Sequence, residues 1–241
     1  MTFRIHQMIA LAACFLAAAS ARGAVITWNA ATNISGDANV LNSYTTVGAF
    51  NLGAAGVSST AVNGVTFAPF AITGASNTVG NFTVAYTGSF YATNTAFGSS
   101  ATPFSSLSGP YQTLLQSGTA TPNGDITLTM AGLTPGQVYY FEWWSNDSGP
   151  RFPIYSTTAT NGNTVALNDN TSGIVAGGLG SWATGTFTAD SSPEVITYSG
   201  SSLTPLFNAF ELQTVPEPAT VSLLVFAGVS MLMQRKRRAM R

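Results

Sequence analysis

Residues 125–144 read DITLTMAGLTPGQVYYFEWW, and this stretch indicates the fold class most directly. In Asp125–Met130, apolar side chains alternate with threonines, a period of two that is typical of a half-buried strand. Pro135-Gly136 suits a type II turn. The aromatic run Gln137–Trp144 predicts a second strand after the turn. The stretch therefore predicts two β-strands joined by a tight connection.

Short β-type runs of the same kind recur along the chain. They are Val25–Trp28, Tyr44–Leu52, Gly64–Phe70, Asn81–Tyr86, Asn163–Leu167, Ser181–Thr188, Glu194–Tyr198 and Leu206–Leu212. Within the last run, alternation places Phe207 on the face opposite to Phe210. Asn63-Gly64 is a hairpin signal, and Gly109–Gln116 is the one helix candidate, with a proline in its first turn. We expect an all-β fold over residues 24–214: a single antiparallel β-sandwich, jelly-roll-like, with one short helix.

Part of this sequence pattern resembles a known class of β-sandwich domain. Gly132–Trp144, with its Gly-Leu-x-Pro-Gly turn before an aromatic strand, is similar to a strand pair in galactose-binding-like domains and carbohydrate-binding modules. Fibronectin-type domains share the pattern, so the resemblance implies a sandwich without choosing among these classes.

The body between residues 24 and 214 is acidic. Arg151 is its only basic residue against eight acidic ones, a net charge of −7, and it has no His, Lys or Cys. So few cations cannot neutralise phosphates, and we therefore expect no nucleic-acid partner. The missing residue types exclude Ser-His-Asp and Cys-His catalysis, and a His or Cys zinc site, within the body.

The N-terminus has the pattern of a secretory signal peptide, which we assign to residues 1–23. An apolar stretch from Met8 to Ala19 is followed by small residues, Ala19-Ser20-Ala21, where a signal peptidase would cleave. Cleavage after Ala21, Gly23 or Ala24 fits equally well. The sequence thus predicts export, with the export machinery and signal peptidase as partners.

Leu11-Ala12-Ala13-Cys14 also matches a lipoprotein box, which offers lipidation of Cys14 as an alternative. However, small or apolar residues continue after Cys14. The cysteine therefore lies inside the hydrophobic region, and the signal-peptide interpretation is favoured.

The last 27 residues, 215–241, form a separate segment. Its motif is Val215, Pro216, Glu217 and Pro218, and a predicted hydrophobic helix follows over residues 219–233. At about 1.5 Å per residue this helix is roughly 22 Å long, short for a hydrocarbon core of roughly 30 Å. The tail 234–241 carries the basic stop Arg235, Lys236, Arg237 and Arg238. These charges predict a cytoplasmic C-terminus and an exported body.

Motif, hydrophobic helix and basic end together resemble the PEP-CTERM sorting signal of Gram-negative bacteria. The resemblance implies processing near Pro216–Pro218 by an exosortase-type membrane protease. It also implies transient anchoring in the inner membrane, followed by a cell-surface or extracellular location in a bacterium that makes exopolysaccharide and biofilm. Independently of the resemblance, the two prolines favour an extended segment that a protease could bind.

Four residues of the body are candidate ligand contacts. Trp143 and Trp144 are adjacent and point to opposite faces of a strand, so one of them could stack on a sugar while the other lies in the core; the alternative is that both are covered. Asp147 and Arg151 follow in a loop and could grip a sugar. Equally, Arg151 could form a structural ion pair with Glu142 or Asp147.

Asp37 and Asp169 lie in oxygen-rich loops and are the candidate ligands for a structural calcium ion. Ordinary Asx turns explain the same residues. We expect no other cofactor.

Glu142 and Asp147 are the only acidic residues close together near aromatics, so a glycosidase would use them as its pair. No catalytic motif supports an enzyme, and we expect none. The sequence instead predicts a cell-surface or extracellular-matrix protein with a structural or adhesive role, and a carbohydrate-binding module for exopolysaccharide is the alternative.

Overall fold

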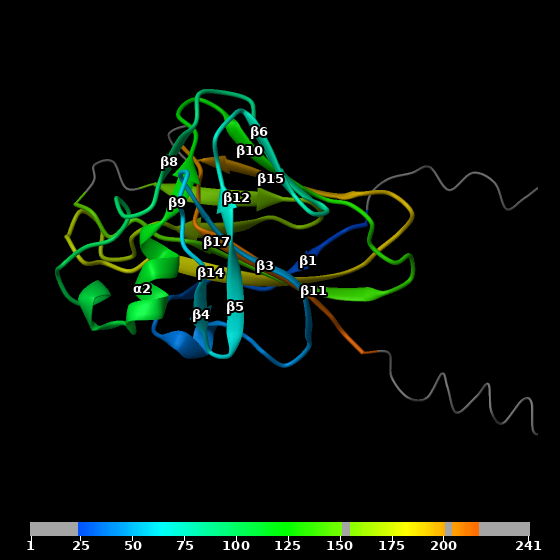
Figure 1. Ribbon diagram of the computed structural model, residues 1–241, viewed down its shortest axis with the longest axis horizontal. Coiled ribbons are helices and arrows are strands. Elements are labelled where there is room, and N and C mark those ends of the chain that lie inside the picture. The colour runs from blue at the N-terminus through cyan, green and yellow to red at the C-terminus, as the bar shows by residue number, and fades with distance from the viewer. Residues whose placement is uncertain (1–23, 151–154, 201–203, 217–241) are drawn as a thin grey trace, which may run out of the picture.

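The computed structural model describes residues 24–150, 155–200 and 204–216. In this part of the chain two large sheets pack face to face, and a small third sheet lies at one end (Figure 1). The predicted antiparallel β-sandwich is confirmed. One pair departs from it, because strands β3 and β5 run parallel.

The sheets are built from short strands that are distant in sequence. The eight-stranded sheet has the order β1 (Thr27–Trp28), β14 (Ser181–Thr188), β11 (Val138–Ser145), β17 (Ala209–Thr214), β3 (Thr45–Gly53), β5 (Val65–Ala71), β4 (Thr60–Val62), with β2 (Thr32–Asn33) paired to β14. The six-stranded sheet has the order β13 (Val165–Asn168), β12 (Ser156–Thr160), β15 (Glu194–Gly200), β10 (Asp125–Met130), β7 (Phe82–Tyr86), β6 (Ser76–Val79). The third sheet has the order β16 (Leu206–Phe207), β9 (Gly118–Ala120), β8 (Tyr91–Thr93).

The main core fills the space between the two large sheets. Phe141, Trp143 and Phe210 of the eight-stranded sheet and Leu128 and Ile196 of the six-stranded sheet are buried there. Each such side chain contributes roughly 1.5–3 kcal/mol on burial. The alternation predicted from the sequence therefore directs one side of each strand into this core.

The outer face of the eight-stranded sheet, the face turned away from the six-stranded sheet, is also covered. Helix α2 (Gly109–Gln116) packs Tyr111 and two leucines into a second cluster there. Ser108 caps the helix, its Oγ accepting from the Tyr111 N–H at 3.2 Å. Two short 3-10 helices, η1 (Asp37–Asn39) and η2 (Phe104–Ser106), add the buried side chains Asn39 and Phe104. The eight-stranded sheet is thus a central layer with two buried faces.

Several predicted elements have the observed bounds, and others were missed. Strands β10 and β14 and helix α2 match, and Asn63-Gly64 joins β4 to β5 with both residues at positive φ, 48° and 83°. The missed strands β2, β4, β6, β8, β9 and β12 have two to five residues each.

The predicted alternation across Leu206–Leu212 is wrong. The strand is interrupted at Asn208, so Phe207 and Phe210 lie on the same side and stack at 5.6 Å between ring centroids.

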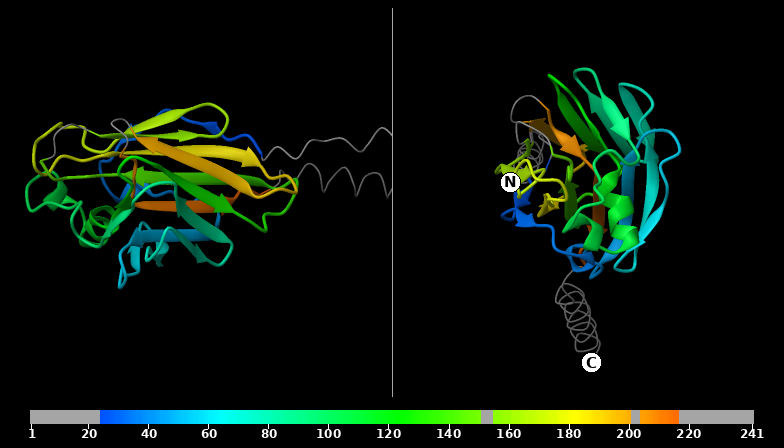
Figure 2. Two further views of the ribbon diagram at one scale, coloured as in Figure 1. Left: turned by 90° about the horizontal axis from the view of Figure 1, so that it is seen from above. Right: turned by 90° about the vertical axis from the view of Figure 1, so that its left-hand side faces the viewer.

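The described chain begins and ends at the same end of the sandwich, at the right of Figure 1. Helix α2 and strands β8 and β9 lie toward the opposite end, and a view from above shows the same separation (Figure 2). Among the described residues no helix is long and apolar enough to cross a membrane. The predicted signal peptide, the helix 219–233 and the basic tail lie outside the described residues.

Candidate functional site

A cavity of about 220 Å³ opens at the end of the sandwich opposite to the described termini. We call it the loop-end cavity. Its wall combines aromatic, aliphatic and carboxylate side chains, among them Tyr91, Phe97, Asp147, Tyr155, Asp169 and Leu206. Strand β8 supplies Tyr91, and the segments after β11 and β13 supply the two aspartates. Residues from distant parts of the chain therefore meet in one hollow.

Two fully buried asparagines hold the cavity wall in place. The Asn146 N–H donates to Asn208 Oδ1 at 2.7 Å, and Asn146 Nδ2 donates to the Phe97 carbonyl at 3.2 Å. The Asp147 N–H donates to the Asp169 carbonyl at 2.6 Å. Because these bonds satisfy backbone groups where β11 leaves its sheet, the loop can be buried without loss of hydrogen bonding.

Asp169 is a carboxyl group of this cavity whose pKa is strongly perturbed. Its Oδ1 accepts from Ser145 Oγ at 2.6 Å, while its buried Oδ2 has no hydrogen-bond partner within the described residues. Burial raises the pKa of Asp169 to about 7, the Ser145 hydrogen bond opposes that shift, and the negative charge of Asp147 adds to it. Near neutral pH the group can therefore either donate or accept a hydrogen bond.

Tyr91 provides the accessible aromatic surface. Its side chain is 48% exposed, and its ring packs edge-on against Phe97 at 6.1 Å between centroids. Thr119 Oγ1 donates to the Tyr91 carbonyl at 3.0 Å, which fixes the backbone beneath the ring. A flat, half-exposed ring beside carboxylates is an amphipathic surface suited to a ligand with apolar faces and hydroxyl edges.

The structure corrects the prediction that Trp143 or Trp144 contacts a ligand. The two side chains do point to opposite faces, but both are 0% exposed. Trp143 packs on Tyr198 in the main core, and Trp144 donates from Nε1 to the Tyr111 hydroxyl at 3.1 Å on the outer face. Neither ring is accessible for stacking, because helix α2 and the loops cover the outer face of the sheet.

The remaining predicted residues are the sugar contacts Asp147 and Arg151 and the calcium ligands Asp37 and Asp169. Asp147 and Asp169, assigned from the sequence to a sugar contact and to a calcium site, lie in the same cavity. Asp37 lies elsewhere, its Oδ1 accepting from Ser108 Oγ at 2.7 Å beside the start of α2. Among the described residues no three His, Cys, Asp or Glu side chains group to hold a metal ion. Arg151 is outside the described residues.

The pairing of Glu142 with Asp147 is wrong. Glu142 lies on the outer face of β11, where its Oε2 accepts from the Leu41 N–H at 3.3 Å, whereas Asp147 lines the loop-end cavity. Strand β11 ends at Ser145, between the two residues, and Glu142 is not among the residues that line the cavity. Their carboxylates do not converge on one substrate.

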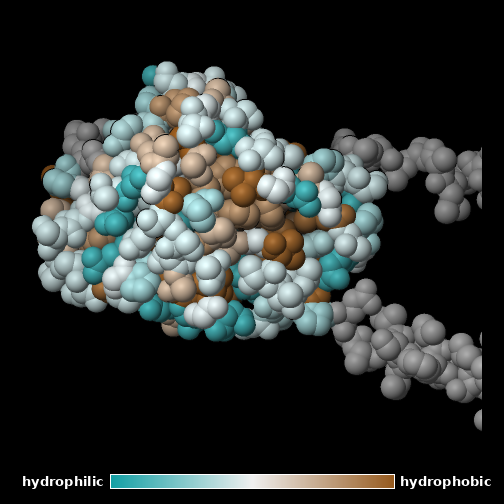
Figure 3. Space-filling model, viewed as in Figure 1, coloured by the Kyte–Doolittle hydropathy of each residue, from teal (hydrophilic) through white to brown (hydrophobic). Residues whose placement is uncertain are grey.

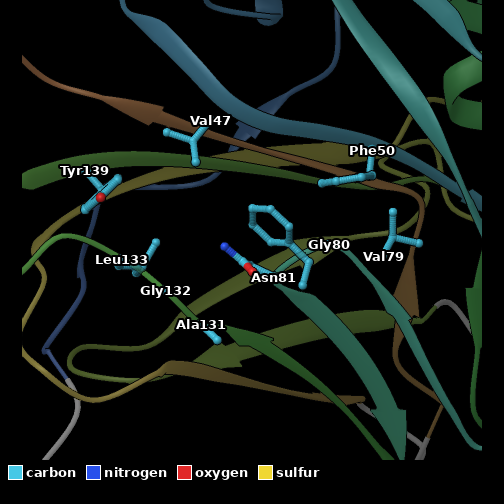
Figure 4. Close-up of a pocket in the computed structure, with 10 residues that line it drawn as sticks. Val47, Phe50, Val79, Gly80, Asn81, Ala131, Gly132, Leu133 and Tyr139 are labelled. Carbon is cyan, nitrogen blue, oxygen red and sulfur yellow. The ribbon is translucent and has the colours of Figure 1, made fainter.

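A second cavity, of about 320 Å³, lies toward the end where the termini emerge (Figure 4). Val47, Leu133 and Tyr139 are among its lining residues, and Asn81 brings an amide. Figure 3 shows hydrophobic side chains gathered in the middle of this face of the molecule. With so few polar side chains, this cavity offers a sugar little hydrogen bonding, so the loop-end cavity is the better candidate site.

No protein-family model and no curated protein matches the chain. One solved structure, described as the structural basis for the promiscuous specificity of carbohydrate-binding modules from the β-sandwich superfamily, is similar at 12% identity. The match covers 59% of this chain and 66% of that chain with a TM-score of 0.17. So low a TM-score carries no functional weight, and the sandwich is established by its own strand pairing.

The sequence did not single out Tyr91 or Phe97. Strand β8 has three residues, too few for a periodic pattern. The only signal was a Phe-Tyr pair, Phe90-Tyr91, inside a stretch rich in Ser, Thr and Asn.

Proposed function

We propose that this chain is an exported cell-surface or matrix protein whose sandwich binds a neutral sugar unit of a polysaccharide in the loop-end cavity. The half-exposed Tyr91 ring beside two carboxylates carries the proposal. The ring would stack on the apolar face of a sugar, and Asp147 and Asp169 would accept hydrogen bonds from its hydroxyls.

The size and charge of the loop-end cavity restrict the class of sugar that it can bind. Its volume of about 220 Å³ is below the roughly 300–1,000 Å³ typical of drug-sized ligands, which favours a single sugar ring. Among the described residues the wall carries two acids and no base, which disfavours a uronic acid as the ligand. A neutral terminal or branch unit fits best.

The position of the cavity suits a protein held at a surface by its tail. The described chain ends beside strand β11, where the Val215 N–H donates to the Val138 carbonyl at 2.9 Å. Gln137 Nε2 donates to the Val215 carbonyl at 2.7 Å. If the segment 219–233 anchors the chain, the loop-end cavity faces away from the membrane.

Sorting through Val215-Pro216-Glu217-Pro218 is part of the same proposal. Val215 is hydrogen-bonded to the body, so the folded domain would lie within a few residues of an exosortase-type protease at the membrane. Export, transient inner-membrane anchoring and release to the surface would follow in that order.

Tyr91→Ala is expected to weaken glycan binding about thirtyfold. Removal of an aromatic anchor at the centre of a binding site costs about 2 kcal/mol, which is close to that factor in Kd. The measurement is glycan-array screening of the full chain, followed by titration with the best neutral glycan.

Tyr44→Ala is the matched control. Tyr44 is 39% exposed and packs on Tyr140 at 5.8 Å between centroids, and it is not among the residues lining the cavity. Equal losses in the two variants, or no binding to any glycan by the wild type, would remove the support for a sugar site and leave a purely structural matrix role.

Glycoside hydrolysis is the second candidate, favoured by one observation. Asp169, whose pKa is raised to about 7, shares the cavity with Asp147, and a pair of carboxyl groups can act as acid and base in glycoside hydrolysis. Both side chains are almost fully buried, which favours binding over chemistry. Release of reducing ends from a bound glycan that stops in Asp169→Asn would establish hydrolysis instead.

The mature protein isolated from its native cells is expected to end near Pro216–Ala219. The two prolines that flank Glu217 favour an extended segment, which would be cleaved there, with loss of the basic tail. Mass spectrometry of the C-terminal peptide makes the measurement, and Glu217→Ala should leave the tail attached. An intact Arg241 in the wild type would contradict processing and indicate a lasting anchor.

A further inference from the structure

Two glutamates face each other on the outer face of the eight-stranded sheet. Glu142 on β11 and Glu211 on β17 are direct cross-strand partners, and both are 0% exposed. Gln213, two residues along β17 on the same face, is equally buried. We call these three side chains the outer-face carboxylate cluster. It lies apart from the loop-end cavity, and none of its members lines that cavity.

Backbone and side-chain contacts tie the cluster to Leu41, before β3, and to Thr46, within β3. Glu142 Oε2 accepts from the Leu41 N–H at 3.3 Å, and Gln213 Nε2 donates to the Leu41 carbonyl at 2.6 Å. Glu211 Oε1 accepts from Thr46 Oγ1 at 2.8 Å and from Gln213 Nε2 at 2.7 Å. The backbone N–H and carbonyl of Leu41 thus contact both strands, which places the three side chains in a single network.

One oxygen of each of these side chains lacks a well-formed hydrogen bond among the described residues, although the Tyr140 hydroxyl also interacts with the Glu142 carboxyl group. Glu142 Oε1, Glu211 Oε2 and Gln213 Oε1 are buried without a hydrogen-bond partner among the described residues. A buried unsatisfied oxygen costs about 1–3 kcal/mol, so three in one network call for an explanation.

No positive side chain is present to neutralise the pair. The described residues contain no Lys, Arg or His. Burial raises the pKa of Glu142 to about 9, the Leu41 N–H opposes that shift, and the neighbouring Glu211 adds to it. The pKa of Glu211 is also raised by burial. A bound cation would stabilise the ionised form of both carboxyl groups.

We propose that the outer-face carboxylate cluster binds a calcium ion through Glu142, Glu211 and the Gln213 carbonyl oxygen. The three unpartnered atoms of the cluster are all oxygens, and two of them belong to carboxylates. None of the three side chains offers nitrogen or sulfur as a free ligand. That is the donor set of a hard cation, and calcium accepts amide and carboxylate oxygens together with water.

The ion would have a structural role. It would join strands β11 and β17 to Leu41, which precedes the sheet's strand β3, and to Thr46 at the start of β3. An exported domain without disulfides would gain stability where calcium is plentiful. The inference does not depend on sugar binding, because the two sites share no residue.

The test measures the melting temperature and metal content of the full chain in detergent, after chelation and after calcium addition. We expect one calcium per chain. We also expect Tm to rise by roughly 5–10 °C at a hundredfold excess over Kd. Magnesium at the same concentration should give less than about a third of that rise, since it demands a tighter octahedral site.

Glu142→Gln and Glu211→Gln are each expected to abolish the rise in Tm and the bound calcium. Their Tm without metal should stay at or above that of the wild type, because a neutral amide replaces a carboxyl that burial disfavours. This comparison separates loss of the ion from loss of folding. Asp125→Asn, on β10, is the matched control and should respond to calcium as the wild type does.

Three results would overturn the proposal. The first is a wild type that neither binds calcium nor shifts its Tm at about 10 mM, well above the Kd of extracellular calcium modules. The second is an undiminished shift in both glutamine variants. The third is a shift that disappears instead in Asp37→Asn or Asp169→Asn, which would assign the ion to those loops.

Discussion

Asn208→Asp is expected to destabilise the protein by about 3–5 kcal/mol, the cost of leaving an uncompensated charge in a buried site. Asn208 Nδ2 donates to three backbone carbonyls, those of Leu115 at 2.9 Å, Ser117 at 2.6 Å and Asn146 at 3.2 Å. A carboxylate in this place would face three acceptors with no proton to offer. Denaturant unfolding followed by tryptophan fluorescence gives the free energy of unfolding directly.

The same substitution at an exposed asparagine is the control. Asn33 lies on the short strand β2 and is exposed, so Asn33→Asp should change the free energy of unfolding by no more than about 0.5 kcal/mol. If Asn208→Asp is no more destabilising than the control, the buried network around Asn208 does not hold the cavity wall, and the placement of Asp147 and Asp169 needs another cause.

The longer strands and the helix could be predicted from the sequence, whereas the shortest strands could not. Strand β10 shows six residues of strict alternation, and helix α2 has a serine cap and a proline in its first turn, so local signals sufficed for both. Strand β8 has three residues and pairs with β9, which is itself three residues long. Such strands exist because a neighbouring strand fixes them, and no local pattern shows that neighbour.

The prediction that Trp143 or Trp144 contacts a ligand was wrong for a related reason, and the alternative that both rings are covered is confirmed. Alternation assigned the two rings to opposite faces, but it could not show that helix α2, some thirty residues earlier in the chain, covers the outer face. The sequence predicts which residues share a face. What packs against that face is decided by tertiary structure.

The candidate site shows the same limit. The sequence predicted Asp147 and Asp169 as parts of two different sites. A hydrogen bond between their backbones brings them together in the structure, and no local sequence pattern shows that contact. Tyr91 joins them from a strand more than fifty residues earlier. The cluster of Glu142, Glu211 and Gln213 likewise depends on the pairing of β11 with β17, which the sequence does not specify.

Gly180→Ala is expected to cost about 3 kcal/mol or more and to abolish glycan binding. A Cβ at this position would lie 2.0 Å from the Ser145 carbonyl oxygen, 2.8 Å from Asn146 Cα and 2.9 Å from the Asp169 carbonyl oxygen. All three are backbone atoms that cannot rotate away, so the overpacking cost falls at the upper end of its usual range of about 1–3 kcal/mol. Thermal unfolding measures the loss of stability, and the glycan titration measures the effect on the cavity.

The effect should reach the cavity because Gly180 lies against the backbone of Asn146, the neighbour of Asp147 in the chain, and of Asp169. Relief of the clash would push Ser145 away from Asp169 and lengthen the 2.6 Å hydrogen bond between their side chains. Gly109→Ala is the matched control, since a Cβ there meets nothing within 4 Å, and it should change the free energy of unfolding by no more than about 0.5 kcal/mol. A Gly180→Ala protein as stable as Gly109→Ala, with unchanged glycan affinity, would mean that the packing of β14 against the cavity wall does not position Asp147 and Asp169.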